Sequence, residues 1–289
     1  MLRMMSKGYV DLRERCLRSV PADVWREPGL RSLALGRNPG LAIPDAIGDL
    51  ASLEALYLDE SEHEAVPESI GRLTGLRVLD LGHNRLASLP AAIGRLAALE
   101  ILYLSDNRFA ELPAPVRPLR ALTYLGATDN ALTELPEWIG ELDALIELRL
   151  YRNRLRKLPD AIGGLQRLRE LHLHDNELAS LPDAIGDLAA LRHLDLRNNR
   201  VASLPDAIGD LAPLRHLDLR NNRVTSLPDA IGDLAALRFL DLRQNRLTTL
   251  PDALGDLPAL EKLDLRWNGF LDPPALAEPL RARGCVVLI

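Results

Sequence analysis

The sequence predicts an α/β solenoid, in which short strands form a parallel β-sheet and each strand returns through a short helical segment. Three observations lead to this prediction. Leucine recurs at one fixed spacing along nearly the whole chain. Within each period the leucines alternate with variable residues, as on a strand with one buried face. An asparagine and a proline then follow at fixed offsets, where a turn and the start of a helical segment are expected.

The period is clearest from Leu181 to Leu234, a stretch that contains two nearly identical copies of one repeat. The common frame is L-x-x-L-x-L-x-x-N-x-L-x-x-L-P-x-x-I-x-x-L, and positions are counted from its first Leu. That Leu falls at residues 30, 53, 76, 99, 122, 145, 168, 191, 214, 237 and 260. No insertion or deletion interrupts the run, so we expect neither a domain boundary nor a linker within it.

The first half of each repeat is expected to form the strand, with the leucines at positions 4 and 6 in the core. Side chains at positions 2, 3, 5, 7 and 8 then face outward. The Asn at position 9 is expected to hydrogen-bond backbone groups that the tight turn leaves unpaired. Ser61 replaces this Asn in one repeat, which predicts a local weak point.

The second half of each repeat is expected to return on the other side of the sheet. Proline followed by an acidic residue, as in Pro205 and Asp206, suits the first turn of a short helix. The Ile and Leu that follow point into the core. The acidic residues of this side are expected to form a solvated face that keeps a leucine-rich chain in solution.

Both ends continue the frame in a degraded form, as is usual for turns that cover an open end of a solenoid. We predict an N-terminal capping repeat over residues 1–29, 23-residue repeats over residues 30–272, and a C-terminal cap over residues 273–289. In the N-terminal cap, Arg15 stands where the Asn is expected.

The C-terminal cap is predicted to contain a short helix, Pro273–Arg283, followed by a last strand. Counting one full period from Leu260 gives Arg283 as the first position of this turn. Val286 and Leu288 would then occupy the two inward-facing strand positions.

These Leu, Asn and Pro positions are those of the leucine-rich repeat family, which the chain resembles over nearly its whole length. The L-P-x-x-I-G-x-L half is similar to the Ras-suppressor, Erbin and Scribble type and to plant and bacterial relatives. The resemblance implies a right-handed horseshoe with the parallel sheet on its concave face and short helices or 3-10 turns on its convex side. No binding residue is carried over, because the variable face is individual to each relative.

Composition and charge limit the function classes. The net charge of −6 and the pI near 5.6 argue against a general nucleic-acid binder. No apolar run approaches the ~20 residues of a membrane span, and the N-terminus lacks the apolar region of a secretory signal. Cys16 and Cys285 would lie at opposite ends of the solenoid, too far apart for a disulfide. We therefore expect a soluble, cytoplasmic protein.

No enzyme motif is present. The sequence lacks G-x-x-x-x-G-K-[ST], G-x-G-x-x-G, H-E-x-x-H, G-x-S-x-G and C-x-x-C. Neither cysteine is placed near a histidine that would activate it. We expect no enzymatic activity and no cofactor.

Aromatic residues and histidines concentrate at the outward positions of the strands, and exposed aromatics and arginines are typical of protein-binding hot spots. The predicted contact residues are Tyr57, Tyr103, Tyr124, Arg149, Tyr151, Arg152, His172, His174, Phe239 and Trp267. The alternative is that the tyrosines only stack between turns, as they do on any strand face.

Two further patterns lie on the same face. Position 5 forms a column of Asp beside a column of Arg at position 7, namely Arg197, Arg220, Arg243 and Arg266. This arrangement is either a self-neutralising ladder or a second strip that accepts carboxylates from a partner. His172 and His174 share a face, and His193 and Asp195 lie one turn on. Nothing supplies the tight ligand geometry of a structural zinc site and no Cys is near, so no metal is expected.

Our leading hypothesis is a non-enzymatic scaffold, with no membrane or nucleic-acid role, that binds a protein partner on the concave face as a monomer. Relatives suggest a cytoplasmic scaffold or, in a bacterium, an effector secreted into a host cell. One alternative is the substrate-recognition part of a larger bacterial effector enzyme, such as a kinase or a ubiquitin ligase. Another is a recently duplicated, consensus-like array with no evolved partner, which the near identity of the two repeats between Leu191 and Leu234 motivates.

Overall fold

The structure is a computed structural model that describes residues 8–27 and 29–289, and it divides into two compact units. Unit 1 runs up to Leu132, and unit 2 runs from Thr133 to Ile289. The sequence period continues through this boundary, so the sequence does not mark it. Residues 1–7 and 28, which belong to the predicted N-terminal cap, lie outside the described residues.

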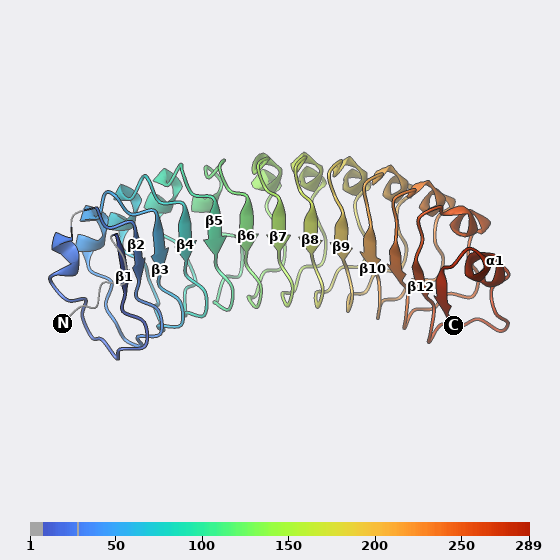
Figure 1. Cartoon of the computed structure of the whole chain (residues 1–289), viewed down its shortest axis with the longest axis horizontal. Helices are drawn as coiled ribbons and strands as arrows, with labels where there is room; N and C mark the ends of the chain where they lie inside the picture. The colour runs from blue at the N-terminus through green and yellow to red at the C-terminus, as the bar shows by residue number, and fades with distance from the viewer. Residues whose placement is uncertain (1–7, 28) are drawn as a thin grey trace. The chain divides into compact units, whose positions relative to one another are not determined.

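Unit 1 carries six strands in its described residues, and they pair in parallel in chain order (Figure 1). The strands are β1 Tyr9–Asp11, β2 Ser32–Ala34, β3 Ala55–Tyr57, β4 Val78–Asp80, β5 Ile101–Tyr103 and β6 Tyr124–Gly126. The returning segments are the 3-10 helices η1 Val24–Arg26, η2 Asp45–Asp49, η3 Glu68–Arg72, η4 Ala91–Arg95 and η5 Ala114–Val116.

Unit 2 repeats this plan with seven strands, again all parallel and in chain order. They are β7 Glu147–Arg149, β8 Glu170–His172, β9 His193–Asp195, β10 His216–Asp218, β11 Phe239–Asp241, β12 Lys262–Asp264 and β13 Val286–Leu288. The helices are η6 Glu137–Glu141, η7 Asp160–Gly164, η8 Asp183–Asp187, η9 Asp206–Asp210, η10 Asp229–Asp233, η11 Asp252–Asp256 and α1 Ala277–Ala282.

The strand register follows the sequence period. Leu194 on β9 pairs with Leu217 on β10, which is the equivalent residue of the next repeat. Leu194, Leu196 and Ile208 are fully buried, so the strand side and the helical side of a turn share one core. Each such side chain contributes about 1.5–3 kcal/mol when it leaves water, and the core of each unit is built from stacked copies of this set.

The returning segments confirm the predicted 3-10 turns. Pro205 precedes η9 in an extended conformation, and its carbonyl accepts a hydrogen bond from Ile208 N at 3.0 Å. Gly209 on η9 has no positive φ, so the turn does not need glycine for its backbone angles. A Cβ at this position would instead lie 2.6 Å from the carbonyl oxygen of Ala230 in the next turn. Glycine is required here because the turns stack closely.

The position-9 asparagines form a ladder inside each unit, as predicted. Asn199 Nδ2 donates to the carbonyls of Leu196 at 2.9 Å and of Leu173, in the preceding turn, at 3.0 Å. Its Oδ1 accepts from Leu178 N, also in the preceding turn. Ser61 keeps only part of this pattern, because its hydroxyl accepts from Asn38 N and donates to Asp59 O.

One regular feature of the turn has no signature in the sequence. The residue at position 8 adopts a left-handed backbone conformation in repeat after repeat, although its identity varies. The residues concerned are Glu14, Arg37, Glu60, His83, Asp106, Asp129, Arg152, Asp175, Asn198, Asn221, Gln244 and Trp267. A left-handed non-glycine residue costs roughly 1–2 kcal/mol, and the hydrogen bonds of the turn offset this cost.

The C-terminal cap contains a last strand and a helix, α1 Ala277–Ala282, which is shorter than the predicted range 273–283. The predicted register of the strand is wrong. Leu263 on β12 pairs with Val287, which lies one period plus one residue later, so the last turn is longer than the others. Val287 is therefore the buried residue, and Val286 is 54% exposed. The extra residue is accommodated around Gly284, whose φ is +90°, where α1 ends.

The two cysteines are free thiols, Cys16 exposed and Cys285 buried. Among the described residues, no helix has the length and apolar character needed to cross a lipid bilayer.

Candidate functional site

The outward sheet face, made of positions 2, 3, 5, 7 and 8, carries the predicted contact residues in both units. In unit 1, Tyr103 ends β5 and Tyr124 begins β6. Their rings contact each other, with centroids 4.8 Å apart and an interplanar angle of 47°. Tyr57 ends β3, and Asp80 on β4 lies between Tyr57 and Tyr103 in the register. The structure thus brings two of the three predicted tyrosines of unit 1 into direct contact.

Asp80 is an acidic group that the sequence did not single out. Burial raises its pKa to about 6, and the neighbouring carboxylates of Asp59 and Glu60 act in the same direction. Gly82 N donates to Asp80 Oδ1 at 2.9 Å, which partly opposes this shift. A half-buried carboxyl that is partly protonated near pH 6 therefore separates the two tyrosine positions.

In unit 2, five of the predicted residues surround one hollow of about 420 Å³. This Tyr151 hollow is lined by Arg149, Tyr151, Arg152, His172, His174, His193, Asp195 and Arg197. The imidazole of His174 stacks on the ring of Tyr151 at 4.2 Å and 10°. The guanidinium of Arg152 lies 5.8 Å from the centre of the same ring. Aromatic faces and arginines therefore meet around a single depression.

The polar groups at the base of the Tyr151 hollow are held by ion pairs. Arg149 pairs with Glu147 on its own strand. His174 Nδ1 lies 3.1 Å from Asp195 Oδ2. Burial opposes ionisation of Asp195, but His174 and Arg197 together lower its pKa. Asp195 is thus an ionised carboxylate although it is only 5% exposed.

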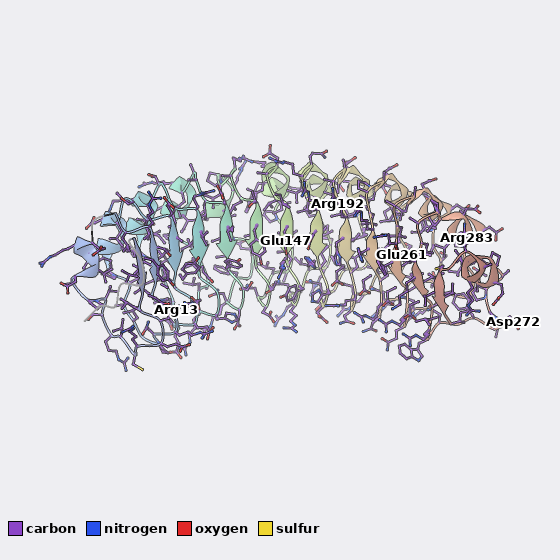
Figure 2. All side chains as sticks on the ribbon, in the orientation of Figure 1. Arg13, Glu147, Arg192, Glu261, Asp272 and Arg283 are labelled. Atoms are coloured by element: carbon purple, nitrogen blue, oxygen red, sulfur yellow. The ribbon has the colours of Figure 1, made fainter. Side chains whose placement is uncertain are left out.

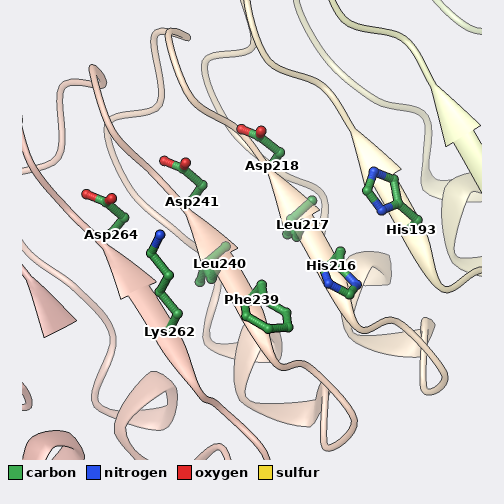
Figure 3. Close-up of a pocket in the computed structure, with 9 residues that line it drawn as sticks. All are labelled: His193, His216, Leu217, Asp218, Phe239, Leu240, Asp241, Lys262 and Asp264. Atoms are coloured by element: carbon green, nitrogen blue, oxygen red, sulfur yellow. The ribbon is translucent and has the colours of Figure 1, made fainter. Parts of the chain in front are cut away.

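Phe239 lies in a second hollow of unit 2, about 200 Å³ in volume. This Phe239 hollow is lined by His193, His216, Leu217, Asp218, Phe239, Leu240, Asp241, Lys262 and Asp264. Figure 3 shows a row of rings beside a row of carboxylates, with Lys262 extending from the first row towards the second. His216 and Phe239 stack at 4.6 Å, and His193 and His216 at 5.5 Å. The signal in the sequence is that His193, His216 and Phe239 share position 3.

Burial controls the titration of the groups in this row. It lowers the pKa of His193, as do the neighbouring imidazoles of His172 and His216. Burial and the guanidinium groups of Arg238 and Arg215 lower the pKa of His216. Both imidazoles are therefore neutral at pH 7. Burial also raises the pKa of Asp218, and the adjacent carboxylates act in the same direction. Arg220 opposes this rise in pKa only in part.

The predicted arginine strip is neutralised by its own strands. Each of its four arginines lies within 2.5–3.5 Å of the Asp two residues before it. The strip consists of Arg197, Arg220, Arg243 and Arg266. This geometry agrees with a self-neutralising ladder between the Asp and Arg columns.

A different set of arginines is available on this face. Arg192 and Arg215, both at position 2, form no ion pair with another described residue. Arg192 is labelled in Figure 2. The repeats that begin at Leu191, Leu214 and Leu237 each carry three Arg and one Asp on the strand side. Their returning sides each carry two Asp and no basic residue. The strand side of these turns is therefore cationic, although the whole chain is acidic.

Trp267 stands apart from both hollows and is 64% exposed. It occupies the left-handed position 8 after β12, and the guanidinium of Arg266 lies 5.3 Å from its ring. The structure thus places the ten predicted contact residues in several groups on the outward face of the two units, and not in one cluster.

Comparison with known proteins identifies the repeat. The family profile described as "Leucine-rich repeat region" matches residues 69–173, 116–192 and 182–270. No curated protein sequence matches the chain.

Several solved structures are similar to this chain. A leucine-rich repeat protein of Leptospira interrogans has 25% identity and a TM-score of 0.52, with 97% of this chain and 95% of that chain covered. A chain of the octameric complex of Latrophilin 3, Unc5D and FLRT2 (LRR) has 25% identity and a TM-score of 0.76, covering 93% and 84%. The ectodomain of the Arabidopsis thaliana receptor kinase GASSHO1/SCHENGEN3, in complex with CASPARIAN STRIP INTEGRITY FACTOR 2, has 30% identity and a TM-score of 0.58, covering 87% and 37%.

Proposed function

Because the chain belongs to the leucine-rich repeat family, we propose that it is a non-enzymatic protein that binds a protein partner on its outward sheet face. Two of the similar structures were solved as complexes, one with Latrophilin 3 and Unc5D and one with CASPARIAN STRIP INTEGRITY FACTOR 2, which supports a role in protein binding. The contact centre in this proposal is the Tyr151 hollow.

One observation carries the proposal. Tyr151 and His174 are stacked at 4.2 Å beside a hollow that arginines line on either side. Stacking fixes the aromatic rings before a partner arrives, so little side-chain entropy is lost on binding. Tyrosine and arginine at the centre of a depression are the residue types that carry most of the energy in protein interfaces.

The charge of the face supports a partner with acidic residues. Arg192 and Arg215 are free of internal ion pairs among the described residues, and each can receive a carboxylate in two parallel hydrogen bonds. The acidic returning side would repel the same partner. An acidic segment is therefore directed to the strand side of unit 2.

Capture from native lysate, read by mass spectrometry, tests the proposal. The wild type is compared with Tyr151→Ala/Arg192→Ala and with a matched control on the returning side, Asp206→Ala/Asp229→Ala. A photoreactive amino acid at position 151 then identifies the residues that touch the partner. We expect the first variant to lose at least tenfold in affinity, which corresponds to about 1.4 kcal/mol or more, and the control to retain the partner.

Other outcomes decide between the alternatives. A partner lost only by the control would place binding on the returning side. A partner held equally by all three proteins would exclude the Tyr151 hollow. Failure of the wild type to capture anything would favour an array without a partner in that lysate.

A further inference from the structure

Two histidines and two carboxylates alternate at the four corners of one patch on β8 and β9. The register pairs Glu170 with His193 and His172 with Asp195. Residues two apart on a strand point to the same face, and paired residues on neighbouring strands lie about 4.8 Å apart. All four side chains therefore project on the outward face as the corners of a small rectangle.

We propose that His172, His193 and Asp195 bind one divalent first-row transition-metal ion, with Zn²⁺ as the representative. The donor atoms of these three side chains lie within 4.8 Å of one another. Zinc binds nitrogen and carboxylate oxygen at about 2.0–2.2 Å, so small side-chain rotations bring all three onto one ion. Two imidazoles and one carboxylate are ligands that suit zinc, copper or nickel better than magnesium or calcium.

The groups around these ligands resemble an outer coordination shell. Glu170 Oε2 lies 3.2 Å from His172 Nε2, and a carboxylate in this position orients a metal-binding imidazole. Asp195 Oδ1 accepts a hydrogen bond from Arg197 N at 3.2 Å, and His174 Nδ1 lies 3.1 Å from Oδ2. The carboxylate is thereby held in one orientation before the ion binds.

Arg197 also sets the strength of the site. Its Nε lies 3.5 Å from Asp195 Oδ2 and repels a cation at the same carboxylate. The affinity is therefore expected to be lower than that of a closed structural zinc site. All three ligands line the Tyr151 hollow, so the ion has a path from solvent and keeps an open fourth position. Three protein ligands with one open position are typical of accessible zinc sites.

In the sequence, His172 and His174 are the more obvious pair of imidazoles, because they stand two residues apart on one strand. The structure places His174 differently, since it stacks on Tyr151 and contacts Asp195. The second imidazole of the proposed site, His193, comes from the neighbouring strand.

Calorimetric titration of the full chain with ZnCl₂, in the absence of any histidine tag, tests the site. We expect one Zn²⁺ per chain for the wild type. His193→Ala should weaken this binding at least about tenfold. His83→Ala, which removes an exposed imidazole in unit 1, should leave it unchanged. Equal effects of the two variants, or no saturable binding by the wild type, would overturn the proposal.

Asp195 is buried, and its replacement can disturb the fold, so a second measurement uses His172→Ala. A ligand that binds only the folded protein raises the melting temperature. Zn²⁺ should therefore raise the melting temperature of the wild type and of His83→Ala, and should not raise that of His172→Ala. An equal shift with Mg²⁺ would mean that carboxylates alone bind the ion and would contradict the proposed ligands.

Discussion

The ring of Tyr124 lies over Gly126, two residues along the same strand. A Cβ at position 126 would stand 3.0 Å from the hydroxyl oxygen of Tyr124 and 3.1 Å from a ring carbon. The absence of a side chain at Gly126 thus lets Tyr124 lie across the sheet beside Tyr103.

The first prediction follows from this contact. Gly126→Ala should displace the Tyr124 ring and weaken its contact with Tyr103, with a change in stability of about 1 kcal/mol or less, since Gly126 has an ordinary backbone φ. Nuclear Overhauser contacts between the two rings provide the measurement. Gly75→Ala is the control, because its nearest neighbour beyond the adjacent residues, Leu53 O, is 3.9 Å away. Unchanged ring contacts in Gly126→Ala would show that the glycine does not position Tyr124.

The second prediction concerns His63, which replaces the core Leu of position 11. It is 7% exposed, its Nε2 has no hydrogen-bond partner among the described residues, and burial lowers its pKa to about 4. The unfolded chain therefore binds a proton near pH 6.5, whereas the folded chain resists protonation down to about pH 4. Stability should fall across this window as pH decreases, by up to about 3 kcal/mol.

His63→Leu should remove this loss and stabilise unit 1 more at pH 5 than at pH 7.5. Denaturant unfolding at both pH values measures the difference. The same pH dependence in His63→Leu and wild type would contradict the prediction.

The third prediction concerns Asp80, whose contribution to stability has the opposite pH dependence to that of His63. Burial raises the pKa of Asp80 to about 6, so between pH 4 and pH 6 the unfolded chain loses a proton that the folded chain retains. Stability from this residue is therefore present below about pH 4 and is lost as pH rises through 6. Asp80→Asn should stabilise unit 1 by about 1–3 kcal/mol at pH 7.5 and by much less at pH 4.

Asparagine keeps an oxygen that can accept the hydrogen bond of Gly82 N, which isolates the effect of charge. Asp106→Asn, at an exposed carboxylate, is the matched control, and unfolding curves at the two pH values give the comparison. A stabilisation of Asp80→Asn that is equal at both pH values would exclude the shifted carboxyl as its cause.

The fourth prediction concerns the asparagine ladder. Asn199→Ala leaves Leu178 N and the carbonyl of Leu173 without their side-chain partner, and each lost buried hydrogen bond costs about 1–3 kcal/mol. Asn199→Ser should cost less, because Ser61 shows that a hydroxyl can make part of the pattern. Hydrogen exchange at the Leu178 amide should accelerate in both variants relative to the wild type. Equal protection in all three would show that the ladder is not important for local stability.

The fold followed from the sequence because its determinants are local and repeated. Leu194, Asn199 and Pro205 each occupy an offset with one physical role, so counting residues was enough to place them. Counting failed at Val286, because the last turn holds one residue more and no residue type marks the insertion. The left-handed position 8 was also missed, since residues as different as His83 and Trp267 occupy it.

Only part of the candidate site could be predicted from the sequence in this way. Alternation along a strand brings Arg197 beside Asp195, and this pairing could be inferred. The ring contacts between Tyr151 and His174 and between His193 and His216 depend on side-chain rotation across neighbouring strands. Burial, which shifts the pKa values of Asp80 and His63, depends on packing that residue types alone do not determine.

The asparagine ladder also bears on how such a gene can change. Asn199 and Asn222 make the same contacts, each with its own turn and the one before it. Removal of residues 191–213 as a block would therefore place Asn222 against the turn that Asn199 now meets. Unequal recombination between the two nearly identical coding segments would shorten or lengthen the protein by whole turns and preserve its hydrogen bonds. A deletion of one residue at the same place would instead shift every later strand by one position and turn its leucines towards water.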